Sequence, residues 1–256
     1  MVDRILAALR GIHPAPSFRL FGDYARSPGA YAILFLWAVF VLTHAWFLLT
    51  GINDDTRLLQ LNAEEGIPEL WEFVMLLASA GLLAIRSVQR KWYALLIPAL
   101  MCLYMALDGR LQIHERAGRA LWASHANAGE FVFMGTIGGL FLLSLLGAII
   151  RSSEIRRTEL TCYAILLVLF GLFGGVVDGS HALLKRFVSG SDNPMAWLED
   201  GGELLVISMM LITSLGVFRR LGQPRQPAGT RDHRLASAGE TEPRYAEPHY
   251  AARTSR

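Results

Sequence analysis

The chain has 256 residues, of which 53% are hydrophobic and 18% charged, and its mean hydropathy is +0.36. A soluble domain of this length carries about 25% charged residues. The composition therefore excludes a disordered chain, a collagen and a disulfide scaffold, and it argues against an ordinary soluble enzyme. The net charge is +2, and the two cysteines, Cys102 and Cys162, lie in apolar runs and offer no cysteine-based zinc motif.

Six apolar runs predict an all-α fold, a polytopic membrane bundle of six transmembrane helices. The predicted spans lie near residues 30–49, 68–85, 92–107, 131–150, 160–177 and 199–218. A helix needs about 20 residues to cross a bilayer, so the third and sixth spans must include acidic neighbours such as Asp108 and Glu199. We therefore expect these carboxylates at, or just inside, the membrane boundary.

Basic residues predict the orientation of the bundle. The segments before span 1, between spans 2 and 3, between spans 4 and 5, and after span 6 hold 18 of the 24 Lys and Arg residues. Both termini are therefore expected on the cytoplasmic side. Residues 1–29 form a cytoplasmic segment in which Met1–Leu9 is either a short interfacial helix or a frayed terminus, and residues 219–256 form a disordered basic cytoplasmic tail.

The spans also predict three outward-pointing helical hairpins that share one design. In the second hairpin the rising span ends at Asp108, followed by glycine, and the descending span carries Glu130 near its start. The third hairpin has the same arrangement with Asp178 and Glu203. Because these acids share one membrane edge, the similarity predicts an internal repeat.

Histidine and carboxylate side chains from separate spans are expected together at the outer edge of the bundle. Such groups suit iron, zinc or manganese, and carboxylate sites in helical bundles often combine a Glu from one helix with a Glu/His pair from another. We predict a divalent metal ion there and no haem, because the histidines are too shallow and irregularly placed for axial ligation. The predicted metal ligands are Glu72, Asp108, His114, Glu115, Glu130, Asp178, His181 and Glu203.

Several of these acids also have purely structural explanations. Glu130 and Glu203 each follow an Asn or Asp by three residues, which matches a helix N-terminal capping pattern. The helix dipole accounts for Glu69 and Glu199 if they begin their helices, whereas Glu72 lies too deep for that explanation.

The end of the third span leaves two alternatives. Asp108 followed by Gly109 is either a helix stop with a left-handed glycine, or a carboxylate that needs a cation or proton to offset the helix dipole. If the helix ends at Gly109, His114 becomes available to the site. If the helix continues, Glu115 shares the face of Asp108 and His114 points elsewhere.

Other polar and small residues favour structural roles. His44 is more consistent with a hydrogen-bonded packing residue than with a ligand, and His125 with a solvated loop residue. The glycines within Gly135–Gly139 are interpreted as helix-packing positions, and Gly171 and Gly174 are expected to let a neighbouring helix approach closely.

Two acidic stretches resemble a pattern found in uncharacterised bacterial multi-pass membrane proteins. The resemblance rests on Ala106–Gly109 with Ile113–Glu115, and on Leu198–Asp200 with Glu203–Leu205. Those proteins have Leu-Asp-Glu…His-Glu after one span and an acidic pair opening a later one. Gly109 here replaces the second acid, which removes one ligand from the pattern. The resemblance implies a protein of the bacterial inner membrane and no particular reaction.

Three functions compete. The first is a metal-dependent membrane enzyme with a site at the periplasmic edge, acting on a lipid or small apolar substrate. The second is a proton or metal-cation transporter or channel, although the inner halves of the spans show no continuous relay. The third is a structural or assembly subunit whose acidic face docks a basic periplasmic protein. We expect membrane lipid, and no nucleic acid, as a partner.

Overall fold

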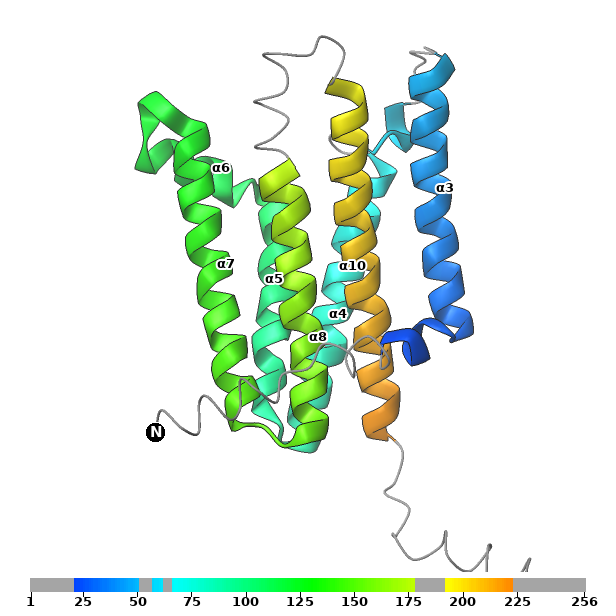
Figure 1. Ribbon diagram of the computed structural model, residues 1–256, viewed down its shortest axis with the longest axis vertical. Coiled ribbons are helices and arrows are strands. Elements are labelled where there is room, and N and C mark those ends of the chain that lie inside the picture. Colours follow the sequence, from blue (N-terminus) through cyan, green and yellow to red (C-terminus); the bar gives the residue numbers. More distant parts are fainter. Residues whose placement is uncertain (1–20, 51–56, 62–65, 178–191, 223–256) are drawn as a thin grey trace, which may run out of the picture. The chain divides into compact units, whose positions relative to one another are not determined.

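The computed structural model describes residues 21–50, 57–61, 66–177 and 192–222. Every regular element in these ranges is helical, and six helices are long and apolar enough to cross a membrane (Figure 1). The prediction of an all-α bundle with six candidate spans is therefore confirmed. This is the architecture of a multi-pass membrane protein.

The helices extend beyond the apolar runs that predicted them. The spanning helices are α3 (Pro28–Thr50), α4 (Ile67–Arg90), α5 (Leu96–Leu111) with the preceding 3₁₀ turn η2 (Tyr93–Leu95), α7 (Ala126–Arg151), α8 (Glu154–Gly171) with the following π-helical segment η4 (Leu172–Val177), and α10 (Asp192–Gly222). The shorter elements are η1 (Arg57–Leu59), α6 (Ile113–Leu121) and η3 (Ala123–His125).

Helix α10 lies at the centre of the packing. Of its membrane-spanning window, 72% is buried, against 11% for α7, so α10 is enclosed by other helices while α7 presents most of its surface outward. Two tryptophans join α10 to α3. The Trp37 indole N–H donates to the Gly201 carbonyl at 3.0 Å, and the Trp197 indole N–H donates to the Val41 carbonyl at 3.1 Å.

The helix pairs in closest contact are not those of the predicted hairpins. Helix α4 packs most closely on α5 and α10, and α7 packs on α6 and α8. Short connections explain two of these pairs, because only residues 91–95 separate α4 from α5, and only two residues separate α7 from α8. The contacts therefore do not single out three outward-pointing hairpins.

The starts of α10 and α8 lie furthest from the predicted boundaries. Helix α10 begins at Asp192 rather than near residue 199, with Pro194 in its first turn, where a missing backbone N–H costs nothing. Helix α8 begins at Glu154, before the apolar run, so that Glu159 lies within the helix and is 0% exposed.

Several predictions concern residues outside the described ranges. These are the helix at Met1–Leu9, the metal ligands Asp178 and His181, and the tail beyond residue 222. The repeat can be examined at only one of its two Asp-Gly positions for the same reason. The side of the membrane on which the termini lie stays a prediction.

Candidate functional site

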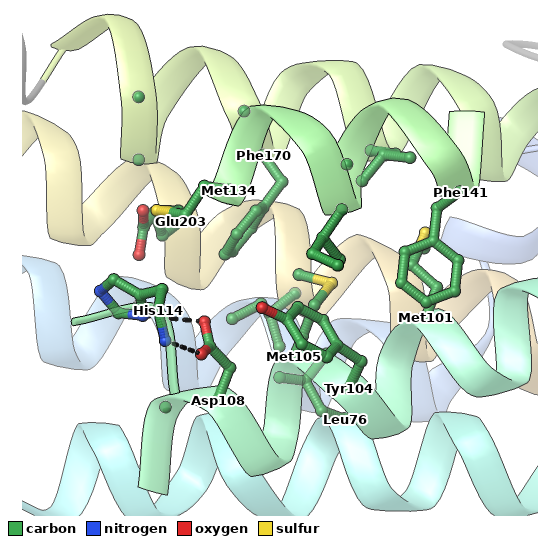
Figure 2. A pocket seen from close by; sticks show the side chains of 18 of the residues that line it. Leu76, Met101, Tyr104, Met105, Asp108, His114, Met134, Phe141, Phe170 and Glu203 are labelled. Atoms are coloured by element: carbon green, nitrogen blue, oxygen red, sulfur yellow. Dashed lines mark hydrogen bonds and ion pairs between the residues drawn. The ribbon is translucent and has the colours of Figure 1, made fainter. Parts of the chain in front are cut away.

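A cavity of about 620 Å³ is lined by residues of α4, α5, α6, α7, α8, η4 and α10 (Figure 2). Figure 2 shows Asp108, His114 and Glu203 together at one end of the cavity, and Met101 and Phe141 at the other. The cavity is therefore polar at one end and apolar at the other. The structure brings five of the eight predicted ligands to its wall: Glu72, Asp108, His114, Glu130 and Glu203.

A reversal of the chain after α5 creates the central polar pair. Helix α5 continues past Gly109 to Leu111 and ends at Gln112, whose left-handed backbone (φ 48°, ψ 47°) turns the chain into α6. Asp108 then accepts a hydrogen bond from the His114 backbone N–H at 2.8 Å, and its second oxygen lies 2.9 Å from His114 Nδ1. Neither alternative from the sequence is fully correct, because the helix passes Gly109 and His114 still reaches the site.

The contact with His114 stabilises the Asp108 carboxylate near the end of α5. The hydrogen bond that His114 donates to the Asp108 carboxylate raises the pKa of His114 above its ordinary value near 6.5, although partial burial acts in the opposite direction. The Asp108 side chain is 13% exposed and that of His114 is 26% exposed, so solvent screens the pair only in part. A histidine whose Nδ1–H donates to a carboxylate has its Nε2 lone pair as the basic site of the neutral ring.

The carboxylates from α7 and α10 are not helix caps. Helix α7 begins at Ala126 and has no acid in its first turn, so Glu130 lies beyond the capping positions. Helix α10 begins at Asp192, which places Glu199 and Glu203 in the body of the helix. The capping interpretation is therefore wrong for Glu130 and Glu203, and the dipole explanation is wrong for Glu199. All three residues line the cavity.

Two glycines make room for these carboxylates. A Cβ atom at Gly174, in the π-helical segment, would overlap the Glu203 carboxylate. A Cβ atom at Gly118 would lie 2.6 Å from the Glu130 backbone nitrogen, where no side chain can stand without a shift of α6 or α7. The close approach expected at Gly174 is thus present, and Gly118 provides a second one that the sequence analysis did not identify.

Helix α4 contributes two further carboxyl side chains, Glu69 and Glu72, to the same end of the cavity. Glu69 lies in the first turn of α4, as the dipole argument expects, and also accepts a hydrogen bond from Arg110 at 3.3 Å. Glu72, almost one turn further along α4, lines the cavity as well. The polar end therefore combines side chains from α4, α5, α6, α7 and α10.

The remaining histidines and acids have other positions. Glu115 pairs with Arg119 at 3.3 Å on α6 and does not line the cavity. His44 is 2% exposed and its Nδ1 accepts the Leu61 backbone N–H at 3.0 Å, as expected of a packing residue. His125 is exposed and contacts the Trp122 ring edge-on.

Most of the apolar wall of the cavity, and one polar group within it, were not predicted from the sequence. Met101, Tyr104, Met105 and Asp108 all line the cavity, and their spacing along α5 was a readable signal of a common face. Tyr104 Oη is buried and interacts with the neighbouring Asp108 carboxylate. Figure 2 shows this hydroxyl on the side of its ring that faces Asp108.

The glycines of α7 border the cavity instead of packing against a helix. Apart from the chain neighbours and the backbone of the same helix, no atom of the residues that the structure describes lies within 4 Å of a Cβ built at Gly135, Gly138 or Gly139. The same is true of Gly171 in α8. The packing interpretation is therefore wrong at these positions, because the missing side chains leave open space that belongs to the cavity.

The described ranges contain no group of three His, Cys, Asp or Glu side chains placed to hold a metal ion. Asp178 and His181 lie outside these ranges, so the predicted ligand set is described only in part. The metal stays a prediction.

The fold and the cavity define a class: an all-helical membrane bundle with a cavity whose polar end gathers acids and one histidine. A family model described as Domain of unknown function (DUF8692) matches residues 32–217, so the chain belongs to this family. No curated protein and no solved structure matches the chain.

Proposed function

We propose that the protein is a bacterial inner-membrane enzyme that takes an amphiphilic molecule into the cavity and acts on its polar head. In this proposal Asp108 and His114 form the base, and the polar end faces the periplasm. The observation that supports it is the division of one cavity into a polar end, with the Asp108–His114 pair, and an apolar end at Met101 and Phe141.

The depth of the two ends matches an amphiphile in a bilayer. Asp108 is three residues from the end of α5, and Glu72 is five residues from the start of α4, so the polar end lies near the helix termini. Met101 is seven residues before Asp108, about 10 Å further along the helix. A lipid also has its head near the interface and its tail toward the bilayer centre, so it fits the cavity without changing its orientation.

The Asp108–His114 pair can do proton-transfer chemistry. The neutral imidazole accepts a proton at Nε2 from water or from a hydroxyl of the bound head group, and the Asp108 carboxylate stabilises the imidazolium that forms. The oxygen that has lost its proton forms the new bond to the head group as the bond to the leaving oxygen or nitrogen breaks, and the imidazolium returns its proton to that leaving atom. Because Asp108 fixes both the backbone and the ring of His114, the base is held in place before the substrate binds.

The sequence predicted a variant of this proposal in which a divalent metal ion binds at the same end of the cavity. A histidine whose Nδ1 is held by a carboxylate is the usual arrangement behind a metal bound at Nε2. Under this version Asp108 orients the ligand His114 instead of binding the metal itself. Iron, zinc and manganese all suit such a site.

Proton or cation transport is a second candidate function, favoured by a set of buried polar side chains. Glu159 is fully buried in the opposite half of the bundle, and on the same helix the Tyr163 hydroxyl shares a hydrogen bond of 2.8 Å with the Ser214 hydroxyl. Glu159 and Tyr163 therefore add buried polar side chains to those that were identified from the sequence. Liposome flux that is lost in Asp108→Asn, without any chemical change in lipid, favours transport over the enzyme.

The test of the enzyme proposal is a chemical one. Proteoliposomes made from a polar bacterial lipid extract are incubated with wild type, Asp108→Asn and Glu115→Gln, and the lipids are followed by mass spectrometry. Wild type and Glu115→Gln should convert one lipid species, and Asp108→Asn should be slower by about 100-fold or more, the usual contribution of a positioned general base. Equal rates in wild type and Asp108→Asn, or no conversion by wild type, would contradict the proposal.

A further inference from the structure

We propose that the head group received by the cavity is a cation, and that the occupant is an amphiphile with an ammonium head and an apolar tail. This inference rests on the cavity assigned under the proposed function, and it names the substrate class. It does not depend on any reaction taking place, so binding and catalysis can be tested apart.

The charge of the cavity wall is the first argument. Among the residues that the structure describes, six carboxyl side chains line the cavity, against one arginine and one histidine: Glu69, Glu72, Asp108, Glu130, Glu199 and Glu203. Even with Arg110 and His114 both positively charged, this described wall holds four more carboxyl groups than cationic groups. A positive head group is attracted to whichever of these carboxyl groups are ionised, whereas an anionic head is repelled by them.

The hydrogen-bonding character of the wall is the second argument. Ionised carboxylates only accept hydrogen bonds, and the buried Tyr104 hydroxyl beside Asp108 can accept one as well. An ammonium group offers up to three N–H donors to such a surface. A phosphate head would instead need clustered donors, and the only cationic side chains in the described wall, Arg110 and His114, already contact Glu69 and Asp108.

The apolar half of the cavity fits the tail. The open space beside Gly135, Gly138 and Gly139 on α7 lies along the same wall as the Phe141 ring. The Met101 side chain faces this region from α5 (Figure 2). A volume of 620 Å³ is within the range of cavities that hold small ligands. The glycines thus leave room for a hydrocarbon tail that larger residues would exclude.

Binding of three probes with the same tail tests the head-group assignment. Dodecylamine, dodecanol and dodecyl phosphate are titrated into the full chain in a non-ionic maltoside detergent and followed by calorimetry. Dodecylamine should bind more tightly than dodecanol by about tenfold or more, and dodecyl phosphate most weakly. Equal affinities for the amine and the alcohol, or tighter binding of the phosphate, would overturn the inference.

Two pairs of variants locate the binding. Glu203→Gln should weaken the amine by about tenfold and leave the alcohol within about twofold, whereas Glu115→Gln, whose side chain does not line the cavity, should change neither. Gly138→Leu fills the tail region and should weaken both probes. Gly147→Leu, on the same helix with nothing within 4 Å of its Cβ and outside the cavity lining, should weaken neither.

Three results would overturn the inference. One is an unchanged amine affinity in Glu203→Gln. Another is equal behaviour of the two glycine variants. The third is stoichiometric binding of Mn²⁺ or Zn²⁺ alone that blocks the amine, which would assign the carboxylates to a metal. A wild type that binds the amine but converts no lipid would leave this inference standing and remove the proposed reaction.

Discussion

His114 and Asp108, six residues apart, face each other across a reversal of the chain and make two contacts, 2.8 Å from the His114 backbone nitrogen and 2.9 Å from Nδ1. One carboxylate therefore caps the start of α6 and orients the imidazole. It also joins the end of a spanning helix to a helix outside the span. This relationship leads to the first prediction.

The pH dependence of stability should report the Asp108–His114 pair. Because the folded state raises the pKa of His114, the stabilisation from this pair is complete below about pH 6.5, the ordinary histidine value, and is lost as the pH rises through the raised folded-state value. We expect Asp108→Asn to lower the free energy of unfolding by about 1–2 kcal/mol at low pH and by less at high pH. Thermal unfolding from about pH 5.5 to about pH 9 measures this difference.

The control for this measurement is Glu115→Gln, because Glu115 also lies beside His114 in sequence but pairs with Arg119. Its effect on stability should be small, and much less dependent on pH. A difference between wild type and Asp108→Asn that grows with rising pH would contradict the assigned role of the pair.

Substitution of Gly118 should separate α6 from α7. A Cβ at Gly118 would lie 2.6 Å from the Glu130 backbone nitrogen, so Gly118→Ala must move one helix, at a cost of about 1–3 kcal/mol. Gly147→Ala is the matched control, since its Cβ meets nothing within 4 Å and alanine is the better helix former. Unfolding temperatures in detergent measure both, and equal values would show that α6 does not pack as described.

The buried carboxylate Glu159 should show its dependence on Arg220 through a double-mutant cycle. Glu159 is 0% exposed and its Oε1 lies 3.7 Å from an Arg220 guanidinium nitrogen. Arg220→Met removes the cation in contact with this carboxylate, leaving the attraction of Arg156, and should cost about 1–2 kcal/mol, less than for a fully buried pair because Arg220 is half exposed. The double variant Glu159→Met/Arg220→Met should recover most of that loss. If the double variant is less stable than Arg220→Met alone, Glu159 has a stabilising partner other than Arg220.

Elemental analysis tests the metal prediction directly. Protein purified without chelator from cells supplied with iron, zinc and manganese is analysed beside His114→Gln. One metal per chain in wild type, lost in the variant, supports a metal at His114 Nε2. No stoichiometric metal in wild type leaves the Asp108–His114 pair to act as the base alone.

Hydropathy and the position of the acids predicted much of this fold. Each of the six apolar runs coincides to within one residue with, or lies inside, a helical segment that is long enough to span, because a helix satisfies all of its backbone hydrogen bonds within the segment. The short third and sixth runs correctly placed Asp108 and Glu203 inside their helices. Asp108 and Glu203 line the same cavity because of the way their helices pack. The sequence alone supported that arrangement only as a hypothesis.

The differences arise where tertiary contacts override local signals. Helix α5 ends at Gln112 and not at Gly109. The two hydrogen bonds between His114 and Asp108 hold the chain reversal at Gln112. Glu159 lies one residue before the apolar run at 160–177 that predicted its span, whereas packing against neighbouring helices buries it completely. Glycines that border a cavity and glycines that pack helices are identical in sequence, so Gly138 could be assigned only from its surroundings.

The central claim is that one cavity holds an amphiphile, and native mass spectrometry of the chain released from membranes tests it most directly. Wild type and Gly147→Leu should each retain one bound amphiphile per chain, and Gly138→Leu should lose it. Retention of the same molecule by Gly138→Leu, or a bare wild-type chain under conditions that preserve bound lipid, would contradict the account.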